Sequence, residues 1–161
     1  MCETVVTPNA TTNLDLFAME ASQNLAQVIG AGTDKVEAKT AFNTWTKTLG
    51  ILQANGVYGM MLYLMAQIGG AREEDLKGEE RCCMATAYHA LSLVDKSFST
   101  TILNCENYLG FLSSEKRMEL VKSVLDNICR NPSKTILART VLERFLIYAR
   151  FNAKALIEGG S

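Results

Sequence analysis

The sequence predicts an all-α protein, a single-domain bundle of about six or seven helices. Apolar residues recur at spacings of three and four through most of the chain, as they do on one face of an α-helix. No segment shows the alternation of a half-buried strand, and only two prolines, Pro8 and Pro132, occur in 161 residues. A chain of this length can bury a core in one domain without disulfides or metals.

The N-terminal part begins with a polar segment. Residues 1–11 are rich in Thr and contain Asn and Pro, so we expect a flexible tail followed by one helical domain over 12–161. Helical periodicity starts at Leu14. Gly30 and Gly32 are expected to end this first helix, because glycine accepts the left-handed conformation of a helix terminus.

The next two predicted helices meet at Asn55-Gly56. Asp34 with Glu37 three residues later resembles a capping box and predicts the start of the second helix. Residues 57–68 predict a third helix that is apolar almost all round. Such a pattern is typical of a buried, central helix.

The C-terminal part predicts four further segments. A fourth helix opens at Glu79, and a short fifth covers about 101–112. Ser113 or Ser114 caps a sixth, and Asn131-Pro132 predicts the start of a last helix that runs to about Ile157. The residues expected to point inward on the sixth helix are Met118, Val121, Leu125, Ile128 and Cys129.

The candidate catalytic groups do not form a site. His89 is the only histidine, and on a helical wheel it lies nearly opposite the apolar stripe of its helix, on the same outer face as Cys82. Seven residues separate the two, about 10 Å along a helix, which is too far for proton transfer. Zinc needs three or four ligands and no third candidate has suitable spacing. We interpret His89 as a surface residue, and Cys82-Cys83 as one inward and one outward thiol.

These observations lead to several expected absences. We predict no enzymatic activity, no metal and no cofactor. The five cysteines show no zinc or redox spacing. The longest apolar run is too short to span a bilayer, and the N-terminus lacks the pattern of a signal peptide. A cytoplasmic protein without a membrane partner is therefore expected.

Charge is distributed unevenly along the chain. Residues 1–115 hold seven Lys/Arg and thirteen Asp/Glu, whereas residues 116–161 hold nine and four. The C-terminal part is therefore expected to contact a polyanion or an acidic partner. Ile136, Ile147 and Phe151 lie on or beside the basic face of the last helix. The candidate RNA-binding or partner-binding residues are Lys122, Arg139, Arg144, Arg150 and Lys154.

Two segments carry a resemblance to a known family. Ile51-Leu52-Gln53-Ala54-Asn55-Gly56 leads into the apolar helix 57–68, and the final helix, 140–158, combines Arg, aromatic and Ala residues and ends in Glu-Gly. In these segments, in helix order and in length the chain resembles the small helical subunit of the type III-B CRISPR effector, the Cmr complex. One departure is the net charge of −1, so any RNA contact must be local.

The resemblance implies a function. Members of that family are non-catalytic helical bundles that stack along an RNA-guided antiviral complex, contact its other subunits and help to hold the guide RNA–target RNA duplex. The expected partners are those subunits and RNAs, and self-association is left open. The alternative is a helical protein–protein adaptor with no RNA role, in which the basic face meets acidic side chains.

Overall fold

The computed structural model describes residues 13–30, 36–69, 75–103 and 114–159. These parts of the chain contain no strand, only an isolated bridge between Ile29 and Val36. A π-helical turn, η3 (Leu125–Cys129), extends the fourth helix. The α-helices are α1 (Leu14–Ala26), α2 (Ala38–Ile68), α3 (Gly78–Phe98), α4 (Ser114–Val124) and α5 (Pro132–Gly159).

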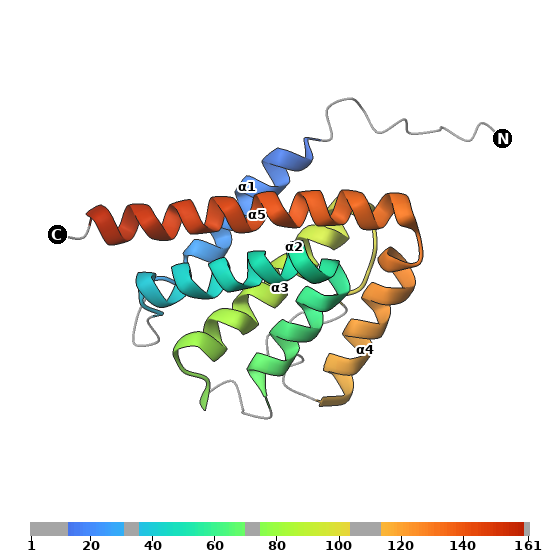
Figure 1. Cartoon of the computed structure of the whole chain (residues 1–161), viewed down its shortest axis with the longest axis horizontal. Helices are drawn as coiled ribbons and strands as arrows, with labels where there is room; N and C mark the ends of the chain where they lie inside the picture. Colours follow the sequence, from blue (N-terminus) through green and yellow to red (C-terminus); the bar gives the residue numbers. More distant parts are fainter. Residues whose placement is uncertain (1–12, 31–35, 70–74, 104–113, 160–161) are drawn as a thin grey trace.

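Helix α5 runs along the longest dimension of the bundle (Figure 1). It packs against α1 and against the first half of α2, while α3 packs on α1 and α2 from the other side. The second half of α2 turns away from α5 and runs toward α4, which lies below the start of α5 in Figure 1. Among the described residues the main neighbours of α5 are α1 and α2, and they leave an outer face of this helix exposed.

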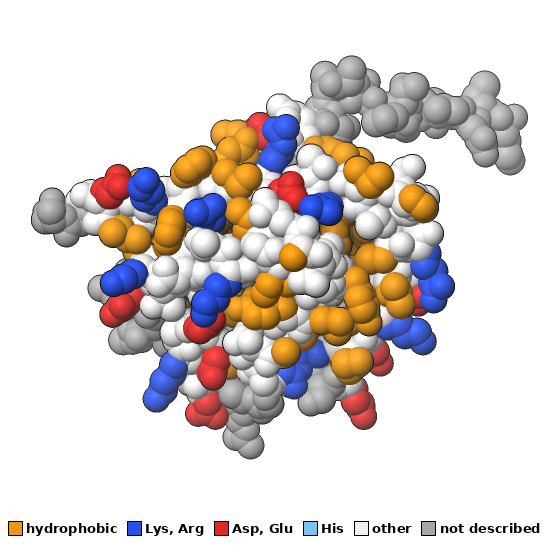
Figure 2. Space-filling model, viewed as in Figure 1, with side chains coloured by type: hydrophobic (Ala, Val, Ile, Leu, Met, Phe, Trp, Pro, Cys, Tyr) orange, Lys and Arg blue, Asp and Glu red, His pale blue; other side chains and the backbone are white. Residues whose placement is uncertain are grey.

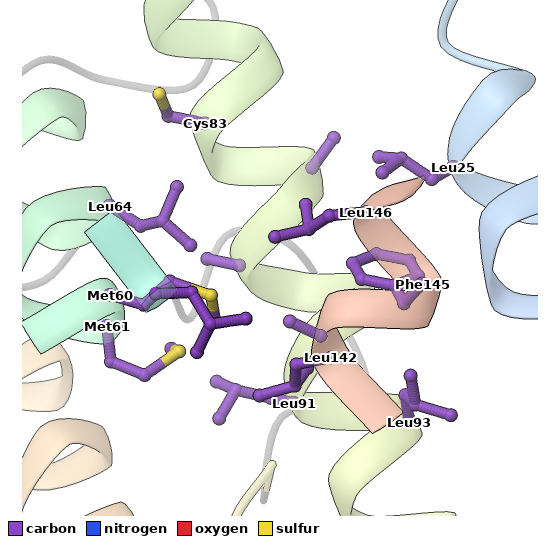
Figure 3. Packing of buried hydrophobic residues seen from close by; sticks show 14 of the residues in the cluster. Leu25, Met60, Met61, Leu64, Cys83, Leu91, Leu93, Leu142, Phe145 and Leu146 are labelled. Atoms are coloured by element: carbon purple, nitrogen blue, oxygen red, sulfur yellow. The ribbon is translucent and has the colours of Figure 1, made fainter. Parts of the chain in front are cut away.

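The core lies between α2, α3 and α5. Its largest fully buried side chains include Trp45, Phe145 and Leu142, and Figure 3 shows Leu142, Phe145 and Leu146 of α5 facing Met60 and Leu64 of α2. The Trp45 indole is also satisfied, because its Nε1–H donates to the Thr86 hydroxyl over 2.9 Å. Burial of apolar side chains, each worth about 1.5–3 kcal/mol, therefore holds the three helices together.

The all-α prediction is confirmed, but the predicted number of six or seven helices is not matched. The break predicted at Asn55-Gly56 is confirmed, because Gly56 leaves the helical conformation at φ 75° and ψ −174°. The second and third predicted helices are the two parts of α2, joined across this kink. Such an interruption bends the helix without ending it. Of the predicted fifth helix, residues 101–103 are not helical and residues 104–112 lie outside the described residues, as does the predicted tail at 1–11.

Some predicted helix ends differ from the observed ones. The first helix ends at Ala26, before Gly30. The second begins one residue after Glu37, which is itself the N-cap and makes no side-chain capping bond, so the predicted capping box is wrong. Asn131 is confirmed as a cap: its side chain accepts from the Lys134 backbone N–H, and α5 begins at Pro132.

Several predicted orientations are wrong for one physical reason. A wheel assumes one buried face, but α3 packs on both α1 and α2, and Cys82 and Cys83 are both fully buried. Likewise α4 buries Leu120 and Val124, which leaves Met118 65% exposed. Residues 57–68 are not buried all round either, because Tyr58 and Leu62 lie on an exposed side of α2.

Helix α2 is long and apolar enough, by length and composition alone, to cross a membrane. This is weak evidence, because the core helix of a folded protein passes the same test. Here α2 contributes Trp45, Leu52 and Met60 to the core and is bent at Gly56. We therefore treat α2 as the central packing helix of the bundle.

Candidate interface on the C-terminal helix

Helix α5 separates a buried side from an uncovered one. The buried side holds Ala138, Leu142, Phe145, Ala149 and Ala153, as the spacing predicts. Leu156, at the next position of this row, is 50% exposed. The last buried residue of α5 is Ala153, so residues 154–159 extend beyond the core.

Two of the predicted arginines on α5 contact α2. Arg139 donates through Nη2 to the backbone carbonyl of Gln53 over 2.9 Å and through Nε to Glu143 over 3.1 Å. The guanidinium of Arg150 lies over the Phe42 ring, 5.2 Å from its centroid. The two arginines are eleven residues apart, about 16 Å along the helix, so they do not form one compact site.

The third predicted arginine on α5 contacts α1. Arg144 donates to the Asp15 carboxylate over 2.7 Å, and the Tyr148 hydroxyl donates to the same oxygen over 2.6 Å. The bonds from Tyr148 and Arg144 lower the pKa of Asp15 below its ordinary value, and the carboxylate raises the pKa of Tyr148. These contacts link α5 to α1 at the surface, and Asp15 already neutralises the charge of Arg144.

The two predicted lysines differ in their surroundings. Lys154 pairs with Glu158 one turn later, with a distance of 3.8 Å and both side chains more than half exposed. A pair of this kind contributes little. Lys122 lies on α4, away from the outer face of α5, and has no ionic partner among the described residues.

The outer face of α5 is therefore mixed rather than continuously basic. Figure 2 shows Lys and Arg side chains separated by hydrophobic and acidic ones along this face. Ile136 and Phe151 are 69% and 64% exposed, while Ile147 is partly buried. Exposed apolar side chains with Arg beside them are typical of a partner surface. The full set of exposed large apolar residues on α5 is Ile136, Leu137, Phe151, Leu156 and Ile157.

A second exposed feature is a groove between α4 and the second half of α2. It has a volume of about 360 Å³, and its lining includes Tyr58, Met118 and Lys122. The π-helical turn begins at Leu125, which also lines the groove. Its walls are mainly apolar.

The thiols and the histidine lie in places that disfavour chemistry. Burial raises the pKa of Cys82 and of Cys83 to about 12, so both stay protonated near neutral pH. His89 is half-buried rather than on the surface; it lies in a groove between α1 and α3 with Glu20 and Lys96. Burial lowers the pKa of this histidine. Within the described ranges, no three His, Cys, Asp or Glu side chains are grouped as metal ligands.

Sequence reasoning missed the partners of these cations. Asp15, Gln53 and Phe42 come from positions far from the arginines in sequence, and one of them contributes only a backbone carbonyl. The wheel identified the face of α5 but not which of its charges are neutralised. A weak signal for one contact was available, because Asp15 is the only acidic residue in the first turn of α1.

These interactions and the exposed apolar side chains together characterise the outer side of α5. Its components are a long helix, exposed apolar side chains toward both ends and arginines held at its edges. Comparisons with protein-family models, with curated proteins and with solved structures find no match to the chain.

Proposed function

We propose that this protein is a non-catalytic small subunit of a type III-B CRISPR RNA-guided effector complex. In that complex it packs against neighbouring subunits and helps to hold guide RNA and target RNA. The observation that carries the binding role is the outer face of α5, where Ile136 and Phe151 are exposed and arginines are held beside them. The choice of complex rests on the resemblance of residues 51–68 and 140–158.

A second candidate function is a protein–protein adaptor with no RNA role. It is favoured by the pairing of Arg139, Arg144 and Lys154 with Glu143, Asp15 and Glu158. Each pair cancels a positive charge that RNA phosphates would otherwise attract. In the adaptor, the arginines position α5 while its apolar side chains bind the partner.

Charge reversal combined with ribonuclease treatment separates the two functions. The five candidate cations (Lys122, Arg139, Arg144, Arg150 and Lys154) are changed to Glu one at a time in the tagged protein, which is then purified from its native cells. The subunit function predicts that reversal at Arg150 or Lys122, the two without an acidic partner, reduces the co-purifying RNA. It also predicts that ribonuclease releases part of the assembly.

The adaptor predicts a different pattern. Its protein partner stays bound after ribonuclease treatment, and an apolar-to-charged change such as Ile136→Asp removes it. Unchanged assembly and RNA retention in all five reversal variants would exclude the RNA-contacting part of the proposal. Asp75→Lys, at an exposed position of the loop before α3, is a charge control for nonspecific effects.

A further inference from the structure

Helices α2 and α5 run antiparallel in a register that two contacts define. Arg150 lies over Phe42, and Arg139 bonds to the Gln53 carbonyl, so the two contacts are eleven residues apart on both helices. Continuing this register toward the start of α2 places Lys39 at the level of Ala153 and Lys154. Figure 1 shows the same geometry, with the first turns of α2 beside the C-terminal part of α5.

This corner of the molecule gathers positive charge that is only partly neutralised. Lys39 is exposed and has no ionic partner among the described residues, and Arg150 has none there either. The Nε of Arg150 is buried and has no hydrogen-bond partner within the described ranges, so only the exposed part of the guanidinium can meet a ligand. Lys154 has only its exposed contact with Glu158. In Figure 2, Lys and Arg side chains recur over this half of the face.

An aromatic ring lies among these cations. Phe151 follows Arg150 directly and is three residues before Lys154, so all three share one turn of helix and the ring is 64% exposed. Phe42 is already covered by the Arg150 guanidinium, which is thereby held in place. Two carboxylates, Glu37 and Glu158, border the corner and limit its net positive charge.

We propose that this corner binds an unpaired stretch of RNA, with a base stacked on Phe151 and phosphates bound by Lys39, Arg150 and Lys154. A positively charged groove or face combined with an exposed ring is how proteins bind single-stranded nucleic acid without sequence preference. The proposal rests on the proposed function and narrows it. It excludes Arg139 and Arg144 as phosphate ligands, because their carboxylate partners lie at 3.1 Å and 2.7 Å, whereas Glu158 lies 3.8 Å from Lys154.

The test measures binding of a short fluorescein-labelled oligouridylate to the full-length protein by fluorescence anisotropy at low ionic strength. Low salt is needed because a few phosphate contacts give weak affinity. Phe151→Leu keeps an apolar side chain but removes the ring, and we expect it to weaken binding about tenfold. Lys39→Ala should lower the slope of log affinity against log salt by about 0.7, the value for one phosphate on a single strand.

Matched controls lie away from this corner. Leu62→Ala removes an exposed apolar side chain from the second half of α2, and Lys134→Ala removes a cation at the other end of α5 that also lacks an ionic partner among the described residues. Both should leave binding unchanged within about twofold. Phe151 and Lys39 are exposed, so these variants are expected to fold.

Three outcomes would overturn the proposal. One is no binding by the unsubstituted protein; another is equal loss in the test and control variants. The third is displacement of the RNA by polyglutamate with no effect of Phe151→Leu, which would assign the corner to an acidic protein. The proposed function is scored separately, by RNA and subunits that co-purify from cells. If RNA and subunits still co-purify but the anisotropy test fails, the RNA site proposed at this corner is contradicted, whereas the proposed function is not.

Discussion

At the scale of single residues, Asp15 is the group whose ionisation is most directly tied to the fold. Its carboxylate accepts from Arg144 and Tyr148 and thereby links α1 to α5. Its pKa is lowered in the folded protein, so the ionised form is favoured by folding. The stabilisation is therefore present above the unfolded pKa of about 3.9 and is lost as pH falls through the lower folded value.

Asp15→Asn should reduce the free energy of unfolding at pH 7, where the carboxylate is ionised. The difference from the unsubstituted protein should shrink as pH falls below about 4, because both side chains are then neutral. Urea unfolding at several pH values measures it. Tyr148→Phe, which removes one donor and keeps the carboxylate, should show a smaller effect. A difference that does not change with pH would show that Asp15 acts through packing alone.

A substitution at Thr86 tests a buried polar contact between α2 and α3. Its hydroxyl accepts from the Trp45 indole, and both residues are fully buried. Thr86→Val keeps the shape but leaves the indole N–H unpaired, which should cost about 1–3 kcal/mol in the free energy of unfolding. Thr46→Val, at an exposed position of α2, is the control and should change stability by less than about 0.5 kcal/mol. Equal effects would mean that the hydrogen bond contributes nothing measurable.

At the scale of elements, the bend in α2 positions the rest of the bundle. It lets the first half of the helix lie along α5 and the second half reach α4. Gly56 adopts φ 75° and ψ −174°, a region that is essentially restricted to glycine. An added Cβ at this position would meet nothing within 4 Å. Any effect of a side chain there is therefore a backbone effect.

Gly56→Ala should destabilise the protein by about 1–3 kcal/mol, because the backbone conformation is strained for any L-residue. Gly50→Ala in the same helix is the matched control: the backbone is helical and the added Cβ also meets nothing. It should stabilise by about 0.5–1 kcal/mol through helix propensity. Thermal unfolding of the pair measures both. The same sign for both substitutions would contradict the role of the bend.

Helix type was predictable from the sequence, whereas the extent of burial was not. Periodicity predicts α1, α3 and α5, and Asn131-Pro132 predicts the start of α5. Periodicity cannot show how many neighbours a helix has. For that reason Cys82 was expected to face outward although α3 is covered on two sides, and Met118 was expected to face inward. A glycine in sequence also cannot distinguish a bend from a helix end.

For the candidate site, the sequence predicted the face of α5 but not the residues that contact its arginines. The wheel found the face of α5 that stays uncovered, since this depends only on the apolar row opposite. It could not find Asp15, Gln53 or Phe42, because these contacts depend on how α1 and α2 lie against α5. The five predicted cations therefore divide into three with acidic partners and two without. Lys122 and Arg150 carry charge that is available to a polyanion, and the exposed 3.8 Å contact of Lys154 with Glu158 leaves this lysine more available than Arg139 or Arg144.

At the scale of the whole molecule, the central claim is that the protein works as a bound subunit. In the part of the chain that the structure describes, two apolar features are exposed, the outer face of α5 and the groove beside Met118. Exposed apolar patches of this kind mark sites of association. Both lie outside the core, so a partner can cover them without any change in the fold.

The most direct test is purification of the tagged full-length protein from its native cells, with identification of every co-purifying protein and RNA. We predict several partner proteins in fixed proportion, together with short RNAs that share a repeat-derived end. A fixed protein partner without RNA would contradict the RNA-guided complex and favour the adaptor. Recovery of the chain alone, at the mass of a single copy, would contradict the claim that it acts as a subunit.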